Sequence, residues 1–306
     1  MIKLLSVMGS ASARLVPFFV AHYRQFGVER FCVTLHYEEG QEEGRDLALS
    51  HLRGAGVEPL NVWRGPFEHD KKEQYLASMR SEQAEGEDWW VYADTDEFHE
   101  FPVRLATLRA QCLRTEKRYV MGRWIDRLAD GGALPEIDPN MDLYRQFPWA
   151  THLSMSLGGK SFDATTKLCF VGSDIVPSNS GFHRPKDRNW REDPDCWPGL
   201  IACNHFKWDQ SVKLRLKQRI SEWSEVRNSV QEAENLEQHL LGHDDRIDLG
   251  SIVPRQRQLD RSPCRRQLMR MVRYSKFLVL SNAMGRNVEA VSGQTAALDQ
   301  RFGIYV

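Results

Sequence analysis

Apolar positions in the first hundred residues follow two alternating patterns: short continuous runs, and longer segments with apolar residues at helical spacing. The runs cover residues 2–8, 30–35, 57–62 and 89–93, and the helical segments cover residues 15–26, 41–53 and 70–84. This series predicts an α/β fold with a parallel sheet and helices on both faces. In such sheets a ligand binds beyond the carboxyl ends of the strands, so the residues after position 93 are of particular interest.

The second hundred residues carry a weaker pattern. We expect a helix over residues 103–113, a strand over 118–124 and a loop-rich region that continues to about residue 200. Loop regions of this length usually bind something, so this one is expected to form the acceptor side of a cleft. Residues 209–237 are helical in composition, with apolar residues on one stripe.

Composition is that of an ordinary globular protein. The 306 residues are 41% hydrophobic and 27% charged, with 41 Lys and Arg against 42 Asp and Glu, and this balance disfavours a protein that wraps nucleic acid. The longest apolar run, residues 15–21, is far short of the ~20 residues that cross a bilayer, and no export signal is visible. The six cysteines form no CxxC pair, so we expect reduced thiols in a cytoplasmic protein.

Three acids follow the fourth predicted strand directly: Asp94, Asp96 and Glu97. Alternation along an extended chain puts Asp94 and Asp96 on the same side, about 6.5–7 Å apart. That spacing suits two carboxylates that converge on one divalent cation, which commonly completes its shell with water and phosphate oxygens. Aspartates are also common as turn residues, but the position at the end of this strand favours the cation site.

Two segments resemble bacterial family 2 glycosyltransferases of the GT-A fold: residues 4–35, with HYRQFGV at 22–28, and YADTDEF at 92–98. Residues 122–131 and 146–148 also resemble uncharacterised members of that group. The resemblance covers about residues 1–210 and implies a Rossmann-like, mostly parallel sheet flanked by helices. The expected organisation is a catalytic domain over residues 1–210, with a nucleotide-sugar half (1–100) and an acceptor half (101–210), and a helical extension over 211–306.

The resemblance also implies an activity. Such an enzyme moves a sugar from a nucleotide diphosphate, such as a UDP- or GDP-sugar, to a hydroxyl of a glycan or lipid-linked acceptor. Asp94 and Asp96 would hold Mn²⁺ or Mg²⁺ against the diphosphate. His205 resembles a further metal ligand of these enzymes, and Lys207 resembles the residue that supports the diphosphate.

The loop after the first strand departs from the family pattern. The usual Asn-Glu is replaced by MGSASAR at residues 8–14. The small residues of this loop permit its backbone to approach a ligand closely, and Met8 at its start is a candidate nucleotide contact. Arg14 at its end could reach a phosphate as a bidentate donor. The alternative is a helix-entry turn with Ser12 as its N-cap.

The catalytic base is the least specified part of the site. An inverting transfer needs a carboxylate that takes the proton from the acceptor hydroxyl, and Asp126 and Asp193 are the candidates. The alternative for each is a surface or salt-bridged acid, and a retaining enzyme would need neither. His183 is either a cleft residue or a hydrogen-bonded structural histidine. Five tryptophans could stack on a sugar acceptor or pack in the core: Trp124, Trp149, Trp190, Trp197 and Trp208.

A basic segment lies near the end of the chain. Residues 255–276 contain eight basic residues against one acid, Asp260. Arg266, Arg270 and Arg273 are at helical spacing, which predicts either a solvated helix that covers the sheet or a peripheral contact with the anionic inner face of a membrane.

Two other functions stay open on sequence grounds. A nucleotidyltransferase has a similar fold, but it normally has a glycine-rich basic first loop, and residues 8–14 hold one glycine and one arginine. A non-catalytic module that binds carbohydrate or a protein partner would keep the fold with a degenerate cleft.

Overall fold

The computed structural model describes residues 1–179, 181–222, 227–252, 255–257 and 279. The strands are β1 (Ile2–Gly9), β2 (Arg30–Tyr37), β3 (Asn61–Arg64), β4 (Trp89–Tyr92), β5 (Glu97–Glu100), β6 (Tyr119–Leu128), β7 (Trp149–Thr151), β8 (Thr166–Gly172), β9 (Ile201–His205) and β10 (Arg255–Arg257). The longer helices are α1 (Val16–Phe26), α2 (Glu42–Gly54), α3 (His69–Glu82), α4 (Leu105–Arg114), α7 (Val212–Glu222) and α8 (Arg227–Leu241); α5 (Leu143–Gln146) and α6 (Leu153–Ser156) are short.

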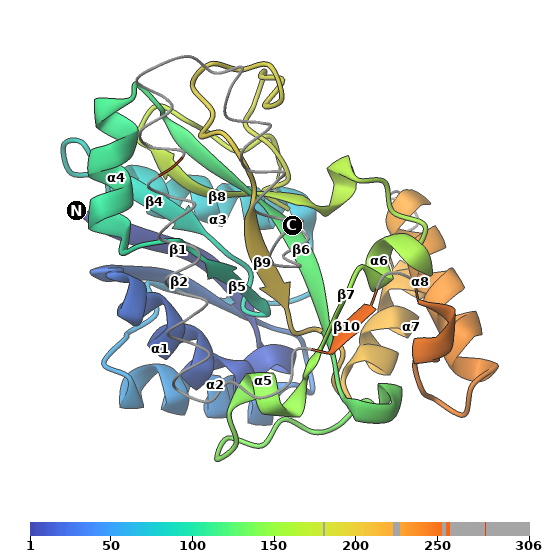
Figure 1. The fold of residues 1–306 in the computed structure, drawn as a ribbon. Helices are drawn as coiled ribbons and strands as arrows, with labels where there is room; N and C mark the ends of the chain where they lie inside the picture. Colours follow the sequence, from blue (N-terminus) through green and yellow to red (C-terminus); the bar gives the residue numbers. More distant parts are fainter. Residues whose placement is uncertain (180, 223–226, 253–254, 258–278, 280–306) are drawn as a thin grey trace.

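One curled sheet with helices on both faces makes up the core, which confirms the predicted α/β fold class (Figure 1). The strand order is β10-β7-β6-β8-β4-β1-β2-β3, and β9 and β5 are attached beside β6. Strands β1 to β4 form a continuous parallel half. In the other half β8 runs antiparallel to both β4 and β6, while β6 and β9 are parallel.

The first predicted elements lie close to where the periodicity placed them. Helix α1 begins with proline in its first turn and ends at Gly27, whose φ of 94° is a left-handed conformation that glycine adopts without strain. The strand expected at residues 57–62 was placed too early. Val57 instead belongs to the turn that ends α2, because its N–H donates to the Leu52 carbonyl at 2.8 Å. Strand β3 therefore begins only at Asn61.

Two hydrophobic clusters fill the two faces of the sheet. Alternating side chains of β1 point to opposite sides, so Leu4 packs with α1, α2 and α4, and Leu5 packs with α3. The cysteines in the described part of the chain are all free thiols, as expected.

The region expected to be loop-rich also contains β7 and β8, and β9 follows it directly; the sequence analysis missed all three strands. These strands are short or fully buried, so they lack the alternation that identifies a half-exposed strand. The helical segment at 209–237 is confirmed as α7 and α8, which pack with the end of β6 through a third cluster that includes Trp208 and Leu236. The division at residue 210 stays a prediction.

No helix in the described residues is both long enough and apolar enough to span a bilayer. The predicted basic surface of Arg266, Arg270 and Arg273 lies outside the described residues.

Candidate functional site

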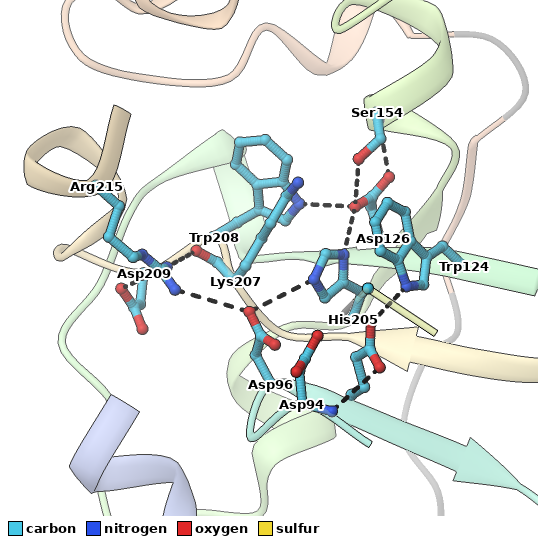
Figure 2. Close-up of polar contacts among 12 residues, drawn as sticks. Asp94, Asp96, Trp124, Asp126, Ser154, His205, Lys207, Trp208, Asp209 and Arg215 are labelled. Carbon is cyan, nitrogen blue, oxygen red and sulfur yellow. Dashed lines mark hydrogen bonds and ion pairs between the residues drawn. The ribbon is translucent and has the colours of Figure 1, made fainter. Parts of the chain in front are cut away.

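Strand pairing brings the acid turn to the end of a distant strand. Residues 93–96 leave β4 and lead into β5, which pairs antiparallel with β9 so that Glu97 lies opposite His205. Asp94 and Asp96 therefore meet His205 and Lys207 although they are more than a hundred positions apart in the sequence (Figure 2). The acids predicted from the sequence are thus gathered with the downstream His-Lys pair.

A cavity of about 290 Å³ opens over this turn at the carboxyl ends of β1 and β4. Its walls include Gly9 at the end of β1, Ser12 just after it, His183 from the long loop, and side chains of α7 and α8. Among the described residues of the lining, cations outnumber acids: Lys72, Lys160, Lys167, Lys207, Arg215 and Arg219 against Asp94, Asp96, Glu97 and Glu232. The excess of positive charge suits an anionic ligand.

Asp94 and Glu97 share a buried lysine. Lys167 Nζ lies 2.8 Å from Glu97 Oε1 and 3.6 Å from Asp94 Oδ2, and Lys72 Nζ lies 2.7 Å from Asp94 Oδ1. Burial opposes the ionisation of Asp94, but Lys72 and Lys167 outweigh it and lower the pKa of this carboxyl. Burial dominates at Glu97 and raises its pKa. Asp94 is therefore ionised at neutral pH and held by two ammonium groups.

Asp96 and His205 form the centre of the site. His205 Nε2 lies 3.4 Å from Asp96 Oδ2, and its Nδ1 lies 3.4 Å from Asp126 Oδ1 on the opposite side (Figure 2). Burial opposes a charge on His205, but the carboxylates of Asp96 and Asp126 outweigh it and raise its pKa. Burial likewise opposes ionisation of Asp96, and His205 and Arg215 outweigh it, so the pKa of Asp96 is lowered.

Asp126 is fixed behind His205. Its carboxylate is 1% exposed and accepts hydrogen bonds from the Ser154 backbone N–H at 2.8 Å, the Ser154 hydroxyl at 3.1 Å and the Trp208 indole N–H at 3.0 Å. The ring of Trp124 stacks on His205 with centroids 4.6 Å apart. A histidine held by a carboxylate at one nitrogen presents its other nitrogen in a fixed direction, here toward Asp96.

The donor set fits a divalent cation at Asp96 and His205. An imidazole whose Nδ1 faces a buried carboxylate and whose Nε2 points at a second carboxylate is the arrangement found around protein-bound transition metals. Asp94 fits less directly, because its two oxygens contact lysines. A cation here would replace part of the positive charge that His205 and Arg215 now place on Asp96.

A second charged cluster lies on the wall formed by the C-terminal helices. Glu232 of α8 is 0% exposed, and its oxygens lie 3.1 Å from Lys160, 3.2 Å from Lys207 and 3.0 Å from Arg219. Burial lowers the pKa of both Lys160 and Arg219, because the carboxylate of Glu232 does not offset their desolvation. The cluster therefore keeps a positive charge that an anionic ligand could neutralise.

Several predicted residues lie away from the cavity lining. Met8 is fully buried, Arg14 forms an ion pair with Glu136, and Asp193 accepts hydrogen bonds from Tyr119 at 2.9 Å and Arg188 at 3.1 Å. Ser12 lines the cavity but does not cap α1, whose N-cap is Leu15. The alternative prediction that Ser12 is the N-cap of the following helix is therefore wrong.

Of the five tryptophans considered as acceptor contacts, Trp124 and Trp208 line the cavity, and Trp149, Trp190 and Trp197 do not. Other lining residues were not predicted at all, namely Lys72, Lys160, Lys167, Arg215, Arg219 and Glu232. The sequence gives no clear signal for them, because charged residues on helices and loops usually face solvent.

Comparisons with known proteins give only remote matches. No family model matches the chain, and no curated protein matches it. Among solved structures, it is similar to the glycosyltransferase TarS of S. aureus, with 11% identity and a TM-score of 0.30 over 78% of this chain and 43% of that one. A TarS fragment, residues 1–349 in complex with UDP-GlcNAc, is 10% identical, with a TM-score of 0.32 over 92% of this chain and 81% of that one. The chain thus spans less than half of the longer TarS chain, and the assignment of function depends on the site itself.

Proposed function

We propose that this protein is a cation-dependent glycosyltransferase that takes a sugar from a nucleotide diphosphate, such as a UDP- or GDP-sugar, and attaches it to a hydroxyl of a glycan or lipid-linked acceptor. One observation carries the proposal. Asp96 and His205 converge in a cavity with excess positive charge, at the carboxyl ends of β1 and β4. Ligands of α/β sheets bind at this edge, and the charge suits a diphosphate.

The residues of the cavity have different roles in the proposed transfer. Lys207 and Arg215 line the cavity, where Arg215 lies 3.7 Å from Asp96, and they bind the diphosphate oxygens through charge-assisted hydrogen bonds. Asp96 and His205 would hold Mn²⁺ or Mg²⁺, which supplies Lewis-acid stabilisation of the leaving diphosphate when bound. Asp94 holds Lys72 and Lys167 beside the same site through ion pairs. These groups are fixed before the substrate arrives, so little reorganisation opposes the reaction.

Asp126 has a positioning role in this proposal. It is buried, receives hydrogen bonds from Ser154 and Trp208, and reaches the cavity only through His205. The sequence prediction that Asp126 or Asp193 takes the acceptor proton stays a prediction, and a retaining reaction would need neither.

The test of the proposed function is a panel of nucleotides followed by a turnover assay. We expect one of UDP, GDP, CDP or dTDP to raise the melting temperature with Mn²⁺ and to lose this effect with EDTA. At 100 times its Kd, a ligand adds about 2.7 kcal/mol of stability. The matching nucleotide sugar should be hydrolysed slowly in the absence of acceptor. Binding without turnover would favour a non-catalytic module, and release of pyrophosphate from a nucleoside triphosphate and a sugar phosphate would favour a nucleotidyltransferase.

Asp126→Asn tests the positioning role. We expect Mn²⁺ to bind about 10–100-fold more weakly, because the carboxylate that orients His205 is lost while the shape of the side chain is kept. Isothermal titration calorimetry with Mn²⁺ measures the change, and Asp174→Asn, which alters a surface ion pair with Arg118, is the matched control. An unchanged Mn²⁺ affinity in a folded Asp126→Asn protein would remove Asp126 from the site.

A further inference from the structure

A second group of metal-binding side chains lies in the core beneath the acid turn. Glu97 and His99 are two positions apart on β5, so their side chains share one face, and His99 pairs directly with Cys203 on β9. One ligand atom from each of these three residues lies within 4.8 Å of the other two. All three residues are 0% exposed. Carboxylate, imidazole and thiol thus meet in a buried site next to the cavity, which Glu97 also lines.

His99 gives the independent reason to expect a ligand. Within the part of the chain that the structure describes, neither of its ring nitrogens has a hydrogen-bond partner, and its ring contacts the aromatic rings of Tyr23 and Phe101. A buried polar group without a partner destabilises the folded protein, and a bound ligand would remove that penalty. Burial lowers the pKa of His99, so its ring stays neutral and keeps the lone pair that binds a metal.

Glu97 and Cys203 can complete the coordination. Glu97 Oε1 accepts from Lys167 and Trp124, whereas Oε2 accepts one backbone N–H, that of Asp94, at 3.2 Å, so lone pairs remain on this oxygen. Burial raises the pKa of the Cys203 thiol, and a bound metal would displace its proton to solvent.

Charge balance also permits a divalent ion at this position. The thiolate of Cys203, Glu97 and Asp94 together would carry three negative charges, and Lys72 and Lys167 carry two positive charges, so a divalent cation changes the net charge of the group from −1 to +1. The ligand atoms would have to draw together by about one ångström to reach metal bonds of about 2.0–2.3 Å. The site is therefore close to the arrangement that a metal requires, without a change in the backbone pairing of β5 and β9.

We propose that Glu97, His99 and Cys203 bind a thiolate-preferring divalent cation, Zn²⁺ above all. Thiolate and imidazole ligands favour Zn²⁺ and Co²⁺, whereas Mg²⁺ and Mn²⁺ favour oxygen ligands. This site is separate from the cation position at Asp96 and His205. A metal here ties β5 to β9 and so fixes the turn that carries Asp94 and Asp96.

Cobalt spectroscopy on the untagged, full-length, reduced protein tests this inference. After treatment with a chelator, we expect one equivalent of Co²⁺ to produce a thiolate-to-metal charge-transfer band, which Zn²⁺ removes and excess Mg²⁺ does not. Cys203→Ser should abolish the band and weaken Zn²⁺ binding by more than about 100-fold, since a direct ligand is lost. Cys112→Ser, at another buried cysteine, and Asp96→Ala should both keep the band.

The outcomes separate this site from the proposed function. A wild-type protein without the charge-transfer band, or a band that survives Cys203→Ser, would overturn the inference. If Cys203→Ser does not fold, His99→Asn replaces it, and survival of the band in that variant has the same meaning. The band in Asp96→Ala reports on the zinc site even if the enzyme proves to have no transferase activity.

Discussion

Asp96→Ala should lower the turnover of the nucleotide sugar in Mn²⁺ by about 100-fold or more, the largest loss of activity that we expect from one substitution. Asp96 is 16% exposed in its side chain and lies 3.4 Å from His205 Nε2, so it is the carboxylate that both faces the cavity and shares the proposed cation with the histidine. Its removal takes away a cation ligand and leaves Arg215 without that partner. Steady-state kinetics over a range of Mn²⁺ concentrations measure the effect.

The comparison needs a conservative variant and a control. Asp96→Asn keeps one oxygen ligand, so a higher Mn²⁺ concentration should restore part of its rate, whereas Asp96→Ala should stay slow. Asp174→Asn should remain within about twofold of wild type, the range of an ordinary surface substitution. An Asp96→Ala protein with a normal rate and a normal dependence on Mn²⁺ would show that the cation is held elsewhere or is not needed.

Glu232→Gln should lower the free energy of unfolding by about 3–5 kcal/mol, the usual effect of breaking a buried ion pair. The substitution keeps the shape of the side chain but leaves Lys160, Lys207 and Arg219 without their shared carboxylate. Urea denaturation measures the loss. Glu234→Gln, at an exposed position of the same helix, is the matched control and should change stability by less than about 0.5 kcal/mol.

The loss of stability caused by Glu232→Gln should depend on pH. Burial opposes the ionisation of Glu232, but Lys207, Lys160 and Arg219 outweigh it and lower its pKa to about 2. Since the unfolded chain has a glutamate pKa of about 4.3, the stabilisation is complete above that pH and is lost as the pH falls toward 2. The stability difference between wild type and Glu232→Gln should therefore shrink on acidification in this range.

Pyrophosphate provides a second test of the cluster. It should stabilise the Glu232→Gln protein more than wild type, because the three cations become available to an external anion. Equal stabilisation of both proteins, together with an unfolding free energy close to that of wild type, would show that the cluster of Glu232 is not the buried charge centre described above.

Sequence reasoning could find acids that line the cavity where chemistry and position were both local, and their role as cation ligands stays a prediction. Asp94 and Asp96 could be recognised because an apolar strand ends directly in acids, and this pattern lies within ten residues. Arg14 shows the limit of such reasoning. Its place after β1 indicated a phosphate contact, but the direction of an exposed side chain is set by its neighbours, and here it pairs with Glu136.

The sequence by itself determined the alternation of β1, α1, β2 and α2, the end of α1 at Gly27 and the acid turn after β4, because burial imposes a period on neighbouring residues. Only the tertiary structure decided that His205 lies opposite Glu97 and that Glu232 is buried. Those facts depend on the pairing of β5 with β9 and on the docking of α8. Pairing and docking join residues far apart in the chain. The local sequence around a charged residue is the same whether the fold exposes its side chain to solvent or buries it among three cations.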